Sequence, residues 1–143
     1  SLDKVYIAGK DGYYDEMIRL AGGTNAYQGE VRYPVVSLEG ILWMDPDVIV
    51  DLVPGYGRFG LSEEALVREW EGTRGTGAWD HNQVLVRGED FWTLPGPRFI
   101  MVIESLAEII DQLTIDNLGS KSNGKTEGWK RNSPKGRRNL NLG

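Results

Sequence analysis

Three short, glycine-containing segments carry the side chains best suited to bind a ligand. They span residues 9–11, 54–60 and 88–92, and each follows an expected strand. In open α/β sheets, ligands bind outside the carboxyl ends of the strands, so these segments should meet at one edge. Aromatic rings there would supply contact area, and charged groups would orient a large, partly flat ligand. The candidate contacts are Tyr56, Arg58, Asp90, Phe91 and Trp92.

Two alternatives compete with this binding site. Phe91 and Trp92 could instead pack beneath the last helix of the chain. The segment 55–60 also matches G-x-G-x-x-G after a strand, which would make the chain a small Rossmann-like nucleotide-binding enzyme module. Pro54 and three bulky or charged residues interrupt that motif, and no acidic residue ends a second strand at the usual distance. The nucleotide reading is therefore the second choice.

Catalysis finds little support in the sequence. General acid–base catalysis needs two carboxylates held in unlike environments, whereas the paired acids here are sequence neighbours in caps or turns. The single histidine, His81, lies in a polar loop, and no cysteine is present. We therefore expect a protein that is not an enzyme and has no resident cofactor or metal site. The paired acids are Asp45/Asp47, Glu63/Glu64 and Glu89/Asp90.

The elements that must position these groups alternate between strand and helix. Ser37 can cap a short helix, with Glu39 in its first turn and Pro46 just beyond its end. An apolar strand follows over residues 47–53, and its composition is typical of a strand buried on both faces. The pattern predicts a three-layer α/β/α sandwich with a short, mostly parallel sheet. The other expected strands span 4–8 and 83–87, and the other helices 12–21, 63–71 and 97–113.

Charge divides the chain into two regions. Residues 1–118 hold 9 of the 16 basic and 20 of the 21 acidic residues, a net charge of −11. Residues 119–143 are basic and rich in Gly, Ser and Asn, so we expect a disordered tail behind a single domain at 1–118. A third reading is an interaction domain whose tail touches nucleic acid, but a solvated tail is preferred and no nucleic-acid partner is expected. We see no apolar run of membrane-spanning length and no signal peptide at Ser1–Lys4.

Three ordered segments give the chain a family resemblance. They are GKDGYYDEMIRLAGGTNAY at 9–27, VRYPVVSLEGILWMDPDVIVDLV at 31–53 and GEDFWTLPGPR at 88–98. In this order they resemble the C-terminal lobe of the periplasmic substrate-binding proteins, helical-backbone metal receptors that serve cobalamin, siderophore and haem ABC importers. The resemblance covers roughly residues 4–113. It implies a solute-binding component that captures a metal chelate outside the cytoplasm and delivers it to a membrane permease.

The resemblance also implies roles for individual residues. In such receptors an acid on the short helix pairs with arginines of the permease dimer, and the matching residue is Glu39. Aromatic residues matching Tyr6 and Tyr33 line the cleft, and an acid matching Asp90 helps to hold the ligand. No direct metal ligand is implied for the chelate receptors. Haem binders that use a tyrosine ligand keep Tyr6, Tyr33 and Tyr56 open as candidates.

The chain departs from the family pattern in its extent. Complete receptors have two lobes joined by a long helix, with the ligand held between them. The N-terminal lobe, that helix and the first strand of this lobe are expected to be missing, so the chain resembles a fragment. Half a cleft should bind weakly, because it loses about half the burial that a ligand pocket provides. A sheet without its central strand should also expose an edge that can pair with another chain.

Overall fold

The computed structural model describes residues 2–93, 96–122 and 139–142. Side chains of 117–122 and 139–142 are left out of the description. The strands are β1 Lys4–Tyr6, β2 Thr24–Asn25, β3 Val35–Ser37, β4 Val48–Leu52, β5 Val84–Arg87 and β6 Asn139–Leu142. The α-helices are α1 Tyr13–Leu20, α2 Leu38–Met44, α3 Glu63–Glu69, α4 Gly77–Asp80 and α5 Phe99–Ser122. Short 3₁₀ helices lie at η1 Tyr56–Phe59, η2 Trp70–Thr73 and η3 Asp90–Trp92.

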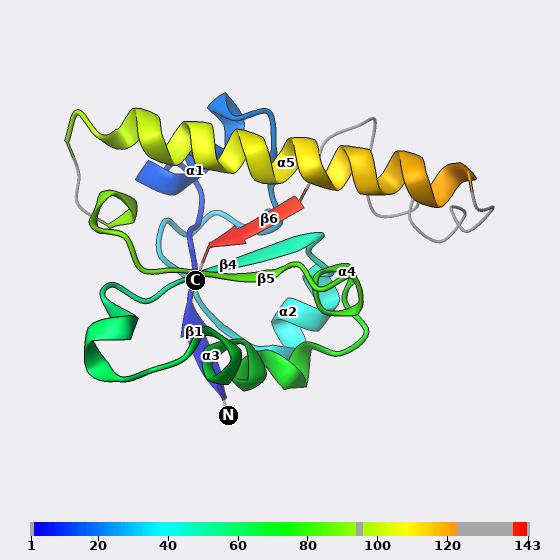
Figure 1. Cartoon of the computed structure of the whole chain (residues 1–143), viewed down its shortest axis with the longest axis horizontal. Helices are drawn as coiled ribbons and strands as arrows, with labels where there is room; N and C mark the ends of the chain where they lie inside the picture. Colours follow the sequence, from blue (N-terminus) through cyan, green and yellow to red (C-terminus); the bar gives the residue numbers. More distant parts are fainter. Residues whose placement is uncertain (1, 94–95, 123–138, 143) are drawn as a thin grey trace.

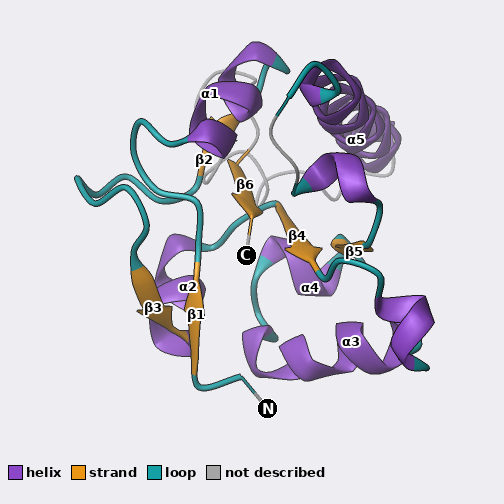
Figure 2. Cartoon of the chain, turned by 90° about the vertical axis from the view of Figure 1, so that its left-hand side faces the viewer, coloured by secondary structure: helices purple, strands orange, loops and turns teal. Residues whose placement is uncertain are grey.

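A parallel sheet of four strands, in the order β2-β6-β4-β5, forms the middle layer. Helices α1 and α5 cover one face of this sheet, and α2, α3 and α4 lie on the other (Figures 1 and 2). This arrangement confirms the predicted α/β sandwich with a mostly parallel sheet.

Strand β4 explains why both layers pack firmly on the sheet. Val48, Ile49 and Val50 have no exposed surface. Val48 and Val50 belong to the cluster under α1 and α5, whereas Ile49 belongs to the cluster under α2 and α4. Because side chains alternate along a strand, an unbroken apolar run can serve both faces at once. The prediction of a strand buried on two sides is confirmed.

The expected alternation of strands and helices had suggested that β1 joins this sheet. Instead, β1 lies outside it. It pairs antiparallel with β3, Tyr6 lying opposite Val35, in a separate ladder of two strands. The pairing continues past β1, where the backbone N–H of Gly9 donates to the carbonyl of Arg32 at 2.9 Å. The fit requires glycine, because a Cβ at position 9 would lie 2.0 Å from the carbonyl oxygen of Val31. Residues 9–11 therefore belong to the β1–β3 arm rather than to the edge of the main sheet.

The C-terminal region differs from the expected disordered tail in two places. Helix α5 continues to Ser122, across the predicted boundary at 118, and β6 lies in the sheet between β2 and β4. In β6, Leu140 lies opposite both Asn25 of β2 and Val48 of β4. The gap expected at a missing central strand is thus filled by residues 139–142. The rest of the predicted tail, 123–138 and 143, lies outside the described residues, and the two-region division remains a prediction.

Candidate functional site

A pocket of about 630 Å³ lies where β4 and β5 end. This volume is within the range of small-molecule sites. Its walls come from the segment that follows β4, from the start of α3 and from the segment that follows β5. Three glycines, Gly55, Gly57 and Gly88, line the pocket, and the larger polar or aromatic side chains are Tyr56, Arg58, Glu63, Arg87, Glu89 and Asp90.

Backbone hydrogen bonds hold the two loops of the pocket side by side. The N–H of Val53 donates to the carbonyl of Arg87, and that of Gly55 donates to the carbonyl of Gly88, both at 3.0 Å. Gly55 has φ +66°, a left-handed conformation that suits glycine. A Cβ on Gly88 would lie 2.7 Å from Cδ1 of Tyr56, so the ring packs closely on bare backbone. Because Gly88 has no side chain, the ring of Tyr56 can pack against its backbone at the pocket.

Charged residues of both signs line the same pocket. Arg87 donates to the carbonyl of Val86 at 2.9 Å, and Glu89 accepts from the backbone N–H of Gly88 at 3.1 Å. Arg58 forms no ion pair with any residue in the described parts of the chain. Its guanidinium can therefore donate to a ligand carboxylate or carbonyl, while Asp90 offers acceptor oxygens.

Three of the predicted contacts, Tyr56, Arg58 and Asp90, meet at this pocket, but Phe91 and Trp92 do not. Trp92 is only 1% exposed and packs against α5 in the core, its ring stacked on Phe91 at 5.8 Å. The short η3 turn directs this ring inward, where its large apolar area leaves water. Trp92 therefore packs beneath the last helix, as the alternative in the sequence analysis proposed. Its assignment to the ligand cleft was wrong.

Tyr6 and Tyr33 lie on the β1–β3 arm, away from the pocket. Their side chains are 74% and 64% exposed, and neither lines the cavity at the ends of β4 and β5. Figure 2 shows β1 and β3 on one side of the molecule and β5 on the other. The predicted gathering of all the aromatic residues at one rim is therefore only partial. Contact of Tyr6 or Tyr33 with a ligand stays a prediction.

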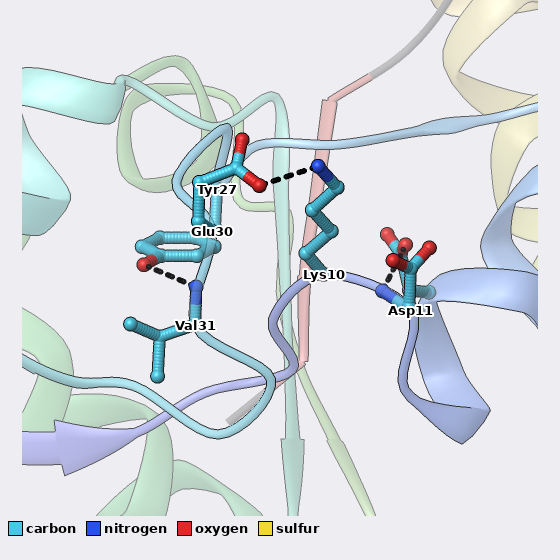
Figure 3. A network of polar contacts seen from close by, with 6 residues as sticks. Lys10, Asp11, Tyr27, Glu30 and Val31 are labelled. Carbon is cyan, nitrogen blue, oxygen red and sulfur yellow. Dashed lines mark hydrogen bonds and ion pairs between the residues drawn. The ribbon is translucent and has the colours of Figure 1, made fainter.

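The first predicted loop, 9–11, is fixed by a polar network of its own (Figure 3). Lys10 forms an ion pair with Glu30 at 2.5 Å, and this hydrogen bond, with the opposite charge, raises the pKa of Lys10. The carboxylate of Asp15 accepts from the backbone N–H of Asp11 at 2.9 Å and from the side-chain amide of Asn25 at 3.0 Å. A smaller cavity of about 260 Å³ lies beside Lys10 and Glu30. Sequence reasoning missed Asp15 and Asn25, whose roles depend on contacts between separate segments.

Glu39 lies on the exposed side of α2. The hydroxyl of Ser37 caps the helix by accepting from the N–H of Gly40 at 3.2 Å, as predicted. Glu39 has no ion pair within the described residues. An exposed acid without a partner is available to a second protein, so the docking role stays open as a prediction.

The nucleotide alternative gains nothing from the geometry of residues 55–60. In a dinucleotide site the glycines lead directly into an α-helix, whose N-terminus binds the phosphates. Here they lead into the 3₁₀ helix η1, and α3 begins only at Glu63, after its cap Ser62. No α-helix therefore begins directly at these glycines.

Sequence reasoning also missed a partly buried acid, Asp51. It lies on β4 opposite Val86, a residue of the pocket wall. Its carboxylate accepts from the indole N–H of Trp70 at 2.9 Å. Burial raises the pKa of Asp51, an effect that the Trp70 hydrogen bond partly opposes. This acid therefore makes stability depend on pH.

Comparisons with known proteins bear on the family of the chain. No family model matches it. An uncharacterized ABC transporter substrate-binding lipoprotein, YvrC of Bacillus subtilis, is 30% identical over 106 residues, which are 74% of this chain and 32% of that protein. The periplasmic haem-binding protein BhuT, solved with two haems, superposes with a TM-score of 0.62 and 27% identity, over 77% of this chain and 40% of its own.

The chain thus spans about a third of YvrC and two fifths of BhuT. Both are named as binding proteins rather than enzymes. Across the described residues, no helix has the length and apolar character needed to cross a membrane. The two similarities confirm the resemblance seen in the sequence: over about three quarters of its length, the chain is similar in sequence and in fold to periplasmic and lipoprotein substrate-binding proteins.

Proposed function

We propose that this chain is the C-terminal lobe of an extracytoplasmic receptor that captures a metal chelate for an ABC importer. The chelate would be a haem, a cobalamin or a ferric siderophore. The observation that carries the proposal is the pocket beyond β4 and β5, where an aromatic ring lies beside a guanidinium without an ion-pair partner in the described residues. This pocket lies on a lobe similar to that of a haem-binding protein.

Each pocket residue has a role that its chemistry supports. The ring of Tyr56 offers an apolar face to a flat ligand, and Arg58 can form a bidentate pair with a carboxylate. Asp90 can accept from a hydroxyl or an amide. Among the three classes, haem suits this combination best, because it is flat and carries two carboxylates.

In the proposed receptor this pocket is half of a clamp. A second lobe would cover the ligand from the other side and supply the burial that the open pocket lacks. The loaded receptor would then dock on the permease dimer through Glu39. The protein would act outside the cytoplasm and reach the membrane through this permease.

Titration of the purified chain with haemin, cyanocobalamin and ferrichrome tests the proposal. We expect one of these chelates to bind, and Arg58→Ala and Tyr56→Ala each to weaken its binding at least tenfold, or about 1.4 kcal/mol. Arg19→Ala, an arginine exposed on α1 and paired with Glu16, is the matched control and should bind normally.

Two outcomes would contradict the proposal. If both pocket variants keep the wild-type dissociation constant, the ligand binds elsewhere. If none of the chelates binds but ATP or NAD raises the melting temperature, the nucleotide-binding alternative is correct.

A further inference from the structure

Strand β6 lies in the middle of the parallel sheet, although it follows every other described element in the sequence. It runs between β2 and β4, with Leu140 opposite Asn25 on one side and opposite Val48 on the other (Figure 2). We call the place that it occupies, between residues 24–25 of β2 and 48–50 of β4, the strand slot. Because β6 bridges these two strands, the order of the sheet depends on what fills this slot.

Both walls of the strand slot are held by contacts that do not involve β6. On the β2 side, the side-chain amide of Asn25 donates to the carbonyl of Ala8 at 2.9 Å and to the carboxylate of Asp15 at 3.0 Å. On the other side, β4 pairs with β5 over four positions, and the N–H of Val53 donates to the carbonyl of Arg87 at 3.0 Å. The slot therefore keeps its walls whichever molecule supplies the strand between them.

An empty slot would be costly. Val48, Ile49 and Val50 have no exposed surface, and a vacant slot would leave the backbone groups of β4 on that side unpaired. Open strand edges of this kind pair readily with another extended chain. Since the ladder is built from backbone groups, the slot selects an extended segment that runs parallel to β4. Every copy of this chain carries one segment with the matching register, residues 139–142.

We propose that β6 exchanges between two copies of this chain, each copy inserting residues 139–142 into the strand slot of the other. Sixteen residues, 123–138, separate α5 from β6 in the sequence. A chain of that length can span at most about 53–58 Å, which is enough to reach a neighbouring molecule. Exchange of an identical element makes the same contacts between molecules as within one, so it costs little. The product is a closed dimer, because neither slot is left vacant.

Insertion of β6 into its own slot competes with exchange. A connection of this length holds the strand near its own slot at an effective concentration on the order of millimolar. Refolding at about 1 mM should therefore give several times more dimer than refolding at about 10 μM. Size-exclusion chromatography with light scattering measures this fraction. The dimer should persist when it is diluted, because both strands must leave their slots before the copies separate.

Cysteine pairs can test the exchange directly, because the chain contains no native cysteine. Thr24 and Asn139 lie opposite each other on β2 and β6, and neighbouring strands are close enough for a disulfide. A Thr24→Cys chain is mixed with an Asn139→Cys chain, refolded at high concentration and oxidised. In this mixture a bond between positions 24 and 139 can form only between two molecules, and peptide mass spectrometry identifies it.

We expect this heterodimer to form with at least about five times the yield of a matched control. The control pairs the Asn139→Cys chain with an Ala65→Cys chain, whose cysteine would be exposed on α3. Leu140→Pro removes a backbone N–H from the middle of β6 and should abolish the wild-type dimer.

Three results would overturn the proposal. The first is a yield in the mixture no higher than in the Ala65→Cys control, while a Thr24→Cys/Asn139→Cys double variant closes into monomers, because β6 then stays in its own molecule. The second is the absence of any bond between positions 24 and 139 in the double variant, because β6 then does not lie beside β2. The third is a dimer that survives Leu140→Pro, because it uses another surface. None of these measurements involves a chelate, so their failure leaves the proposed receptor function intact.

Discussion

Two tryptophans in opposite environments allow a direct test of the packing. Trp92 is 1% exposed in the core, whereas Trp43 is 87% exposed on α2. The same substitution, tryptophan to alanine, should therefore have very different effects on the free energy of unfolding at these positions. We expect Trp92→Ala to destabilise the protein strongly and Trp43→Ala to leave its stability almost unchanged.

The size of the effect at Trp92 follows from its burial. A buried aromatic side chain removes about 150–250 Å² from water. At about 25 cal/mol per Å², this corresponds to roughly 4–6 kcal/mol, an upper bound because unfolded chains are partly compact. Within the described residues, the indole N–H of Trp92 is also buried without an acceptor, and its removal returns part of the loss. We therefore expect about 3 kcal/mol, a large part of the roughly 5–15 kcal/mol of a typical domain.

Urea unfolding followed by far-UV circular dichroism measures this difference, since fluorescence would change with the tryptophan content. Trp43→Ala should stay within about 0.5 kcal/mol of wild type. Trp92→Phe should lose much less than Trp92→Ala and keep wild-type affinity for the chelate, because this ring does not line the pocket. Equal midpoint shifts for the two alanine variants would refute the assignment of Trp92 to the core.

Two further predictions concern other positions. The native state favours the protonated form of Asp51, so its ionisation costs stability as pH rises through the raised pKa. Asp51→Asn, whose amide oxygen can still accept from Trp70, should therefore melt at a higher temperature than wild type near neutral pH. Thermal melts should show that this gain shrinks as the pH falls toward about pH 4. If the difference in melting temperature is the same at every pH, the charge of Asp51 does not have this role. Gly9→Ala should cost about 1–3 kcal/mol, because its Cβ meets the backbone of the β1–β3 arm, whereas Gly57→Ala, with open space around it, should cost less in the same melts.

Local signals predicted much of the fold. The apolar run of β4 indicated a strand buried on both faces, and Ser37 caps α2 as expected. The pairing of β1 could not be predicted in the same way, because its partner is set by the path of a later loop. Strand β6 has only four residues, and its place depends on a gap between distant strands.

The candidate site was predicted in part for a similar reason. The rule that ligands bind at the carboxyl ends of strands correctly brought Tyr56, Arg58 and Asp90 together. It could not give the direction of each side chain within a short turn, so Trp92 was placed in the cleft rather than in the core. The polar network around Asp15 has no sequence signature, because its partners come from separate segments.

The position of β6 has a consequence for how the protein is made. Thr24 and Asn139, which pair across the sheet, are 115 positions apart in the sequence (139 − 24). During synthesis, β2 and β4 leave the ribosome long before β6 and cannot be bridged by it until residues 139–142 emerge. Contacts between such distant residues form slowly, and strand edges left open in the meantime are prone to aggregation. Translation rate and chaperone supply should thus affect the folding of this sheet more than that of a helical bundle, whose contacts are local.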